Sequence, residues 1–226
     1  MNLLEVKKAV VISPHPDDET LGVGGTISKL LKKGVEVQIL VVSGHLPPLY
    51  SYSEFNTTKI EMIDAMKLIG IPEEMISFLE IPATYIHSEP VSEVNKKICS
   101  FISRIEPDLV FIPFLDRHID HRVIFDASMV CTRPVGNSFP RLILSYETLS
   151  ETHWNASYIE PNFNPDFYVD ITLDIQTKIR ALEKFSSQIK TDSARSIEAV
   201  ESLAKFRGSQ NGCKFAEAFK LIRCIV

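Results

Sequence analysis

Residues 10–19 read Val-Val-Ile-Ser-Pro-His-Pro-Asp-Asp-Glu. The apolar, β-branched beginning predicts a buried strand that ends abruptly, and a histidine and three acidic residues follow it directly. In α/β proteins the carboxyl ends of central strands open into the crevice that binds ligands. Clustered carboxylates cost free energy when they lose water, and a divalent cation removes that cost. The alternative is a solvated acidic turn that caps the next helix, because acids favour helix N-termini.

A second segment of the same kind follows later in the chain. Residues 107–113 predict another buried strand, and His118-Ile119-Asp120-His121 comes just after it. The chain has six histidines, and three of them stand in these two segments. Imidazole and carboxylate are ordinary zinc ligands, and a catalytic site needs three protein ligands and an open position. The two segments together therefore predict a metal site at one edge of a sheet.

The rest of the chain predicts an α/β fold in which strands and helices alternate, which favours parallel pairing with right-handed crossovers. We expect a Rossmann-like three-layer sandwich with a mostly parallel central sheet, formed by residues 1–226 as a single domain. The expected strands are 8–13, 35–42, 76–79, 109–112, 142–146 and 167–171, and the expected helices are 24–33, 56–69, 91–105, 121–131, 173–189 and 193–207. Segments 44–55 and 148–165 are expected to be irregular loops that determine specificity.

Composition narrows the function class. The chain has 226 residues, of which 45% are hydrophobic and 23% charged, as in ordinary globular proteins. The formal net charge of −5 gives no basic surface for nucleic acid. No apolar run approaches the ~20 residues that span a membrane, and residues 1–8 lack the pattern of a signal peptide. The four dispersed cysteines form no CxxC pair and predict buried thiols in a reducing cytoplasm, none of them a ligand.

Three motifs in this order resemble a known family. They are His15-Pro16-Asp17-Asp18-Glu19, Gly24-Gly25-Thr26 and His118-x-Asp120-His121. The chain resembles the PIG-L/LmbE-like zinc-dependent de-N-acetylases nearly end to end, with weaker matches at 145–148, 187–188 and 216–219. One departure is Lys59 near Glu61, where the family often carries an arginine shortly before the glutamate.

The resemblance implies roles for six residues. His15, Asp18 and His121 would bind zinc, although such nitrogen and oxygen ligands also accept Fe²⁺ or Mn²⁺. Asp17 would be the catalytic base, and His118 would lie beside the substrate carbonyl with Asp120 as its partner. The expected activity is removal of the N-acetyl group from an N-acetylglucosamine-type amino sugar or its conjugate. The expected partners are this small-molecule substrate and, because the family often assembles, further copies of the chain.

The chemistry of the residues supports these roles and leaves alternatives open. Asp17 suits general base catalysis, because a carboxylate beside the ligands takes the proton of the attacking water; it could instead orient a ligand. A protonated His118 suits donation to the developing oxyanion. Asp120 is expected to orient a neighbouring side chain, Glu19 to cap the following helix, and Asp116 to belong to the site rim or to the loop.

Other function classes fit less well but remain open. A metal-dependent amidase acting on a non-sugar amide would use the same residues. A non-catalytic metal-binding or sugar-binding module would not need Asp17 and His118. A dinucleotide-binding turn is disfavoured, because residues 22–25 lack the complete G-x-G-x-x-G pattern, and Ser43-Gly44-His45 ends the second strand without the ribose-binding acid. We expect the glycines of residues 22–25 to let the first helix pack closely.

Overall fold

The computed structural model describes residues 6–226 except 137, 157 and 192. Its centre is a seven-stranded sheet with the order β3-β2-β1-β4-β5-β7-β6. The strands are β1 (Lys8–Ser13), β2 (Glu36–Gly44), β3 (Ile76–Pro82), β4 (Leu109–Pro113), β5 (Leu142–Tyr146), β6 (Phe167–Asp170) and β7 (Ala216–Cys224). The first five pair in parallel, whereas β7 runs antiparallel to both β5 and β6. The mostly parallel sheet of the sequence-based prediction is thus confirmed.

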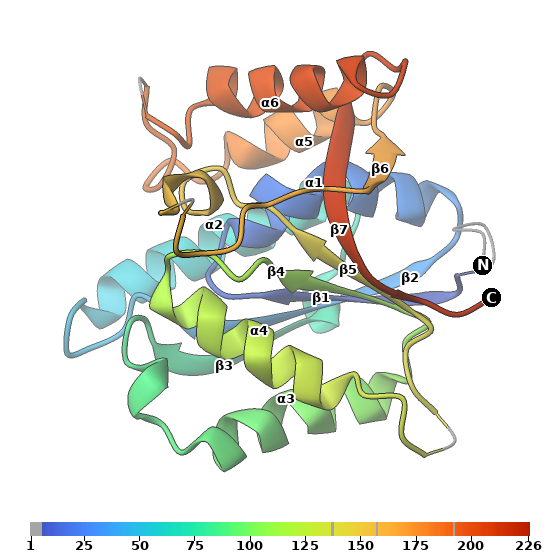
Figure 1. The fold of residues 1–226 in the computed structure, drawn as a ribbon. Helices are drawn as coiled ribbons and strands as arrows, with labels where there is room; N and C mark the ends of the chain where they lie inside the picture. The colour runs from blue at the N-terminus through green and yellow to red at the C-terminus, as the bar shows by residue number, and fades with distance from the viewer. Residues whose placement is uncertain (1–5, 137, 157, 192) are drawn as a thin grey trace.

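The described residues form six α-helices, which cover the two faces of this sheet (Figure 1). They are α1 (Asp18–Lys32), α2 (Tyr52–Ile69), α3 (Val91–Ile105), α4 (Ile119–Cys131), α5 (Ile175–Leu182) and α6 (Ile197–Ser209). Helices α1, α2, α5 and α6 lie on one face, and α3 and α4 lie on the other. Each face has its own apolar core, because alternate residues of the buried strands point to opposite sides. This is the expected three-layer arrangement.

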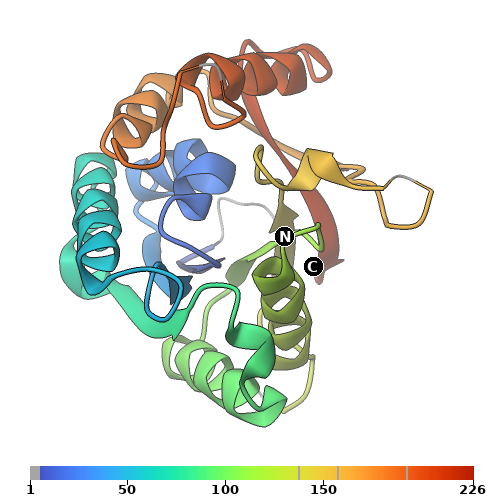
Figure 2. The same cartoon turned by 90° about the vertical axis from the view of Figure 1, so that its left-hand side faces the viewer.

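The order of the strands places the two motif segments side by side. The chain runs outward from β1 to β2 and β3 on one side, and from β4 to β5 on the other. Val11 of β1 pairs with Ile39 of β2 and with Phe111 of β4, so β1 and β4 are adjacent where the winding reverses. Ligands bind at such switch points, outside the carboxyl ends of the strands. Figure 2 looks onto this edge of the sheet.

Most elements lie where the sequence predicts them. Strands β1 and β5 and helix α3 have the predicted bounds, and α2 ends at the predicted Gly70, whose φ of 113° is left-handed. Helix α1 begins at Asp18 rather than at residue 24, so the acidic residues stand on its first turn. Helix α5 is shorter than predicted, and strand β7 was not predicted at all.

The close packing expected of the glycines in α1 is confirmed. A Cβ added to Gly25 would lie 2.8 Å from Ile171 Cδ1, and one added to Gly22 would lie 2.3 Å from Tyr146 Cδ2. These distances are shorter than any ordinary carbon contact, so larger side chains would push α1 away from its neighbours. The glycines therefore let α1 approach the end of β5 and the residue that follows β6.

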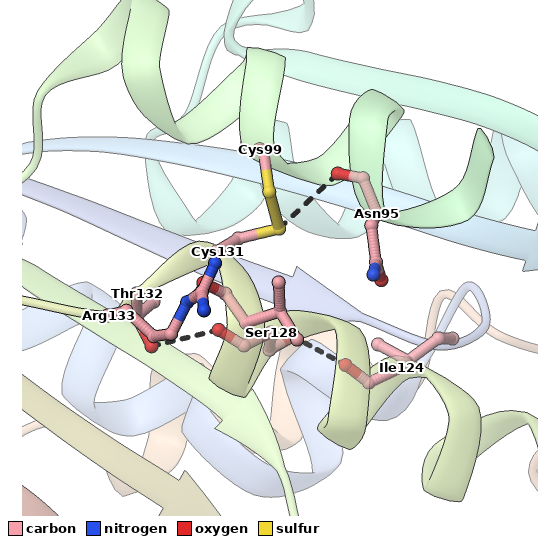
Figure 3. The surroundings of a disulfide bond; sticks show 8 residues. Asn95, Cys99, Ile124, Ser128, Cys131, Thr132 and Arg133 are labelled. Carbon is pink, nitrogen blue, oxygen red and sulfur yellow. Dashed lines mark hydrogen bonds between the residues drawn. A yellow bond between two sulfur atoms is a disulfide. The ribbon is translucent and has the colours of Figure 1, made fainter. Parts of the chain in front are cut away.

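The cysteines differ from the prediction of buried thiols. Cys99 of α3 and Cys131 at the end of α4 form a disulfide, with the Asn95 carbonyl 3.3 Å from Cys131 Sγ (Figure 3). Cys213 is half-buried and Cys224 is exposed. The prediction was wrong because Cys99 and Cys131 stand 32 positions apart in the sequence and come together only where α3 packs against α4. None of the described helices is both long and apolar enough to cross a membrane.

Candidate metal centre

The carboxyl ends of β1 and β4 bring three imidazole rings together. His15 lies in the turn after β1, His118 is the N-cap of α4, and His121 lies in the first turn of α4. The ring centroid of His15 lies 4.6 Å from that of His118 and 5.6 Å from that of His121. One nitrogen from each ring lies within 4.8 Å of the others, close enough for a shared metal ion.

Asp18 completes the cluster. Its Oδ2 is 3.1 Å from His15 Nδ1 and 3.3 Å from His121 Nε2, so the carboxylate lies between the two rings. Asp18 and His121 are almost completely buried, whereas His118 is half-buried at the pocket wall. The structure thus brings together all three predicted ligands, with His118 beside them.

The rings of His15 and His121 are each oriented by a hydrogen bond to a carboxylate. Asp120 Oδ2 lies 2.8 Å from His15 Nε2, and Asp116 Oδ2 lies 2.9 Å from His121 Nδ1. Histidines that ligate metals commonly donate their other ring nitrogen to a carboxylate in this way. His15 is thereby left with Nδ1, and His121 with Nε2, for a ligand. Asp116, whose role the sequence left open, is an orienting residue.

The buried polar atoms of the cluster fit a cation. Among the described residues, Asp18 Oδ1, Asp120 Oδ1 and His121 Nε2 are buried without a hydrogen-bond partner. Buried polar atoms are nearly always paired, because each unpaired one costs free energy. The donor set of two oriented imidazoles and a carboxylate is that of a catalytic zinc site. The residues present therefore fit a divalent metal ion.

The protonation of the two oriented rings reflects their carboxylate partners. Burial disfavours the charged form of His15, but hydrogen bonds to Asp120 and Asp18 outweigh it and raise its pKa to about 9. Burial likewise opposes the charge on His121, while Asp18 and Asp116 raise its pKa to about 10. Burial also disfavours the charge on Asp18, yet the His121 and His15 charges hold its pKa well below the usual range. Without a metal ion, both rings carry protons that ligation must displace.

Asp17 sits beside this cluster in a strained backbone conformation. Its φ of 123° lies in the region that favours glycine, and its carboxyl group is buried. Strain of about 1–3 kcal/mol at such positions is typical of functional sites. Burial raises the pKa of Asp17 to about 7, although the charge of Arg195 opposes that shift. A carboxyl group with a pKa near neutrality suits proton transfer.

Arg195 reaches the carboxylate of Asp17 from the segment between α5 and α6. Its Nη1 donates to Asp17 Oδ2 at 3.0 Å, its Nε donates to Ser150 Oγ at 2.9 Å, and its Nη2 is 3.5 Å from Glu151 Oε1. Sequence reasoning missed Arg195, because it stands 178 positions from Asp17 in an irregular segment with no motif. The expected arginine position near Glu61 is different: Lys59 pairs with Glu80, and Glu61 accepts hydrogen bonds from Ser186 and Ser187.

His118 differs in part from its predicted environment. Its Nδ1 accepts from the backbone N–H of Asp120 at 3.2 Å, while the Asp120 carboxylate contacts His15 instead. Burial and the charges of His15 and His121 lower the pKa of His118 to about 4. The expectation of a protonated His118 held by the Asp120 carboxylate is therefore corrected: this carboxylate contacts His15, and the lowered pKa favours a neutral His118, which carries its proton on Nε2 because Nδ1 accepts from the backbone.

A cavity of about 240 Å³ opens onto these groups. Its described lining comprises His15, Pro16, Asp17, His45, Tyr50, Ala83, Thr84, His118, Gln188 and Arg195. His45, which directly follows β2, is thus one of the residues at this cavity. Among the tyrosine and tryptophan residues of segments 44–55 and 148–165, Tyr50 lines the cavity, whereas Tyr52, Trp154 and Tyr158 are exposed and are not among its described lining residues.

Other polar residues support the loops around the site. Glu19 was expected to cap α1, but its Oε2 instead accepts from the backbone N–H of Asp17 at 3.2 Å and from Ser13 Oγ at 3.0 Å. Burial raises the pKa of Glu19 to about 7 against these hydrogen bonds. Glu217 accepts from backbone N–H groups of α1, and Arg207 pairs with Glu147, so both side chains make structural contacts.

Comparison with known proteins agrees with this geometry. Residues 10–132 match the model of the PIG-L family, described as GlcNAc-PI de-N-acetylase. The chain belongs to the PIG-L family. The predicted family is thereby confirmed, and the matched segment contains every residue of the histidine and carboxylate cluster.

Three individual proteins illustrate the similarity. The chain is 27% identical to a diacetylchitobiose deacetylase of Thermococcus kodakarensis over 96% of this chain and 84% of that protein. The solved N,N'-diacetylchitobiose deacetylase of Pyrococcus horikoshii superposes with a TM-score of 0.77 at 24% identity, covering 96% and 84% of the two chains. The 4-carboxy-2-hydroxymuconate hydratase of Pseudomonas putida shares the fold, with a TM-score of 0.78 at 16% identity over 97% and 98%.

Proposed function

We propose that the protein is a metal-dependent hydrolase, with zinc as the preferred ion and Fe²⁺ or Mn²⁺ as alternatives. It removes the N-acetyl group from an N-acetylglucosamine-type amino sugar and releases acetate and a free amine. One observation carries this proposal: the buried Asp17 stands on the strained turn between His15 and Asp18, facing the same cavity as His118. A purely structural metal site does not need these additional groups.

The metal would be held by His15 through Nδ1, by His121 through Nε2 and by Asp18. A bound ion lowers the pKa of water and polarises a carbonyl group. Asp120 and Asp116 keep the two rings in the ligating orientation. The high pKa values of both rings without metal mean that these carboxylates also stabilise the protonated site, so metal binding competes with protons.

Asp17 would take the proton of the attacking water and pass it to the departing nitrogen, which leaves as the amine. Arg195 binds only Oδ2 of Asp17, and this contact holds the carboxylate on the cavity wall. Neutral His118 would donate its Nε2 proton in a hydrogen bond to the carbonyl oxygen as negative charge develops there. Water supplies the second carboxylate oxygen of acetate, and the amide C–N bond breaks.

The substrate class follows from the relatives. Both deacetylases described above act, by their names, on the N-acetylated disaccharide diacetylchitobiose. The cavity of about 240 Å³ and its polar rim suit a single acetylated amino sugar at the reacting position. A non-sugar amide would leave these polar side chains without partners.

The decisive experiment measures acetate and free amine released by the metal-loaded protein from N-acetylated amino sugars and, for comparison, from N-acetylated amino acids. We expect equal amounts of acetate and amine from the sugars, and loss of both on chelation. Release from the amino acids alone would indicate an amidase. No release with zinc, iron or manganese, despite bound metal, would indicate a binding module.

A further inference from the structure

The segment that follows β5 contacts the carboxylate that orients His121. Thr152 lies in a short 3₁₀ turn, Thr152–Trp154, and its Oγ1 is 3.1 Å from Asp116 Oδ2. The same Asp116 oxygen accepts the hydrogen bond from His121 Nδ1. Neither Thr152 nor Asp116 is among the described residues that line the cavity beside the histidine cluster. Thr152 therefore touches the group that orients a metal ligand, and it does so outside the space left for a substrate.

The hydroxyl proton of Thr152 is directed at Asp116. Thr152 and Asp116 are both almost completely buried, and Thr152 Oγ1 accepts a hydrogen bond from the backbone N–H of Thr148 at 2.8 Å. A threonine hydroxyl has a single proton to donate, and among the described residues the acceptor that it contacts is the Asp116 carboxylate. The backbone of Thr148 thus fixes the position of the oxygen, and Asp116 receives the proton in a hydrogen bond.

The Asp116 carboxylate is held on both of its oxygens. Its Oδ1 accepts from the backbone N–H of His118 at 3.0 Å, and its Oδ2 accepts from the His121 ring at 2.9 Å and from Thr152. Rotation of the carboxylate plane would break at least one of these three hydrogen bonds. Two of the donors belong to residues 116–121 themselves, so the Thr152 hydroxyl is the donor that comes from a distant part of the chain.

A second contact anchors the same segment to the start of α4. Glu160 pairs with Arg122 and, at 3.2 Å, with Arg117. Arg122 Nε in turn donates to the backbone carbonyl oxygen of Asp116 at 2.6 Å. Through Thr152 and through Arg122, the segment after β5 therefore stabilises both the carboxylate and the backbone carbonyl of Asp116.

We propose that Thr152 is a positioning residue of the metal centre, which holds the Asp116 carboxylate and thereby keeps His121 Nε2 directed at the ion. This inference rests on the metal site of the proposed function and is independent of the substrate. Residues that orient metal ligands contribute roughly 10–100-fold to metal affinity. Because Thr152 supplies one of three hydrogen bonds to Asp116, its contribution lies at the lower end of that range.

The first test measures zinc affinity, by competition with a chelator, in variants of Thr152. Thr152→Val keeps the branched shape without the hydroxyl and should weaken zinc binding about tenfold. Thr152→Ser keeps the hydroxyl and should bind zinc nearly as tightly as the wild type. Thr132→Val is the matched control, because Thr132 is equally buried and donates to the Ser128 carbonyl at the other end of α4. Unchanged affinity in Thr152→Val, or an equal loss in Thr152→Ser, would overturn the proposal.

A double-mutant cycle shows whether Thr152 acts through Asp116. Asp116→Ala should weaken zinc binding by itself, and adding Thr152→Val should cause little further loss, because the hydrogen bond between the two side chains is already absent. If the two losses in affinity multiply instead, the effect of Thr152→Val comes from the fold of its segment, and the proposal fails.

The wild-type protein allows a test that needs no folded variant. The Thr152 hydroxyl proton and the His121 Nδ1 proton are expected to point at the same oxygen, so they should lie close together. NMR of the zinc-loaded protein should show a nuclear Overhauser effect between these two protons. A hydroxyl proton that shows no such effect would contradict the proposed direction of the hydrogen bond.

These measurements separate the inference from the proposed function, because none of them requires turnover. If Thr152→Val loses zinc affinity while the zinc-loaded wild type releases no acetate, the positioning role stands and the deacetylase function fails. If acetate is released but Thr152→Val binds zinc as tightly as the wild type, the positioning role fails and the deacetylase function stands.

Discussion

Two parts of the chain, from β1 to α4 and from β5 to β7, contribute different kinds of groups to the cavity beside the histidine cluster. The first part is parallel and supplies the imidazoles, Asp17 and Asp18. The second contains the antiparallel β7 and supplies Gln188 and Arg195, which shape the cavity and hold Asp17. The family match at residues 10–132 stops where α4 ends. The candidate metal ligands therefore all come from the first part, whereas the second part contributes two of the residues that line the cavity around them.

The division between the two parts is wrong if the first part does not hold the metal. Replacing His15, Asp18 or His121 with alanine should abolish both bound metal and activity, because three ligands cannot become two without a large loss of affinity. His118→Ala is the matched variant and should keep the metal while kcat falls more than KM rises. Metal content of the purified proteins checks this. Full metal in two of the three ligand variants would contradict the assignment.

Asp17 tests whether base and ligand are separate groups. Asp17→Asn keeps the shape and polarity of the side chain but cannot accept a proton. We expect metal content to persist and kcat to fall by roughly 10² or more, the usual contribution of general base catalysis. Metal analysis and kcat measured on the same preparation decide the matter. Loss of metal in Asp17→Asn would mean that Asp17, rather than Asp18, is the ligand.

The raised pKa values of His15 and His121, about 9 and about 10, predict a steep pH dependence of metal affinity. Near neutral pH both rings are protonated without metal, whereas ligating rings are neutral, so binding releases two protons. Affinity should therefore rise with pH below pH 9, by up to about 100-fold per unit, and fall as pH falls. Competition with a chelator at several pH values measures the slope. Asp120→Asn should reduce the slope. A metal affinity that does not change with pH in the wild type would contradict the pairing of His15 and His121 with their carboxylates.

Substitutions of Arg195 test what the second part of the chain contributes to turnover. Arg195→Met should keep the metal but lower kcat about tenfold or more, because a charge-assisted hydrogen bond to Asp17 is lost. Arg195→Lys should recover part of the activity, since one ammonium replaces only some of the guanidinium contacts. Arg180→Met, on the exposed side of α5, is the control. Restoration of Arg195→Met by added guanidinium would show a direct effect on Asp17; unchanged kcat would assign Arg195 a purely structural role.

The sequence predicts the first part better than the second for a physical reason. His15 and Asp18 directly follow a recognisable buried strand, as do His118 and His121, and parallel winding places the ends of such strands together. No local sequence pattern predicts the contact of Arg195 or the disulfide, because both depend on segments that meet only when the chain packs. Strand β7 was missed since Glu217, an apparent surface residue, is buried within it.

Glu217 provides the smallest expected effect on turnover, and it tests whether the second part also supports the fold of the first. Its carboxylate accepts from Gly25 N at 2.9 Å, Thr26 N at 2.7 Å and Lys178 Nζ at 2.6 Å, all buried. Glu217→Ala would leave the Lys178 ammonium buried beside the Leu21 carbonyl alone. Removing one partner of such a pair costs about 3–5 kcal/mol of unfolding free energy.

For a chain of this size, that cost corresponds to a lower melting temperature, by roughly 2–4 °C for each kcal/mol. The variant that remains folded should keep its metal, with kcat changed by less than about twofold, because Glu217 contacts none of the cavity groups. Lys178→Met should cost less than Glu217→Ala, since Glu217 then retains two backbone donors. Thermal unfolding and metal content together check this. A strong loss of metal at unchanged stability would show that Glu217 acts on the metal loop through α1, and the division between the two parts would have to be redrawn.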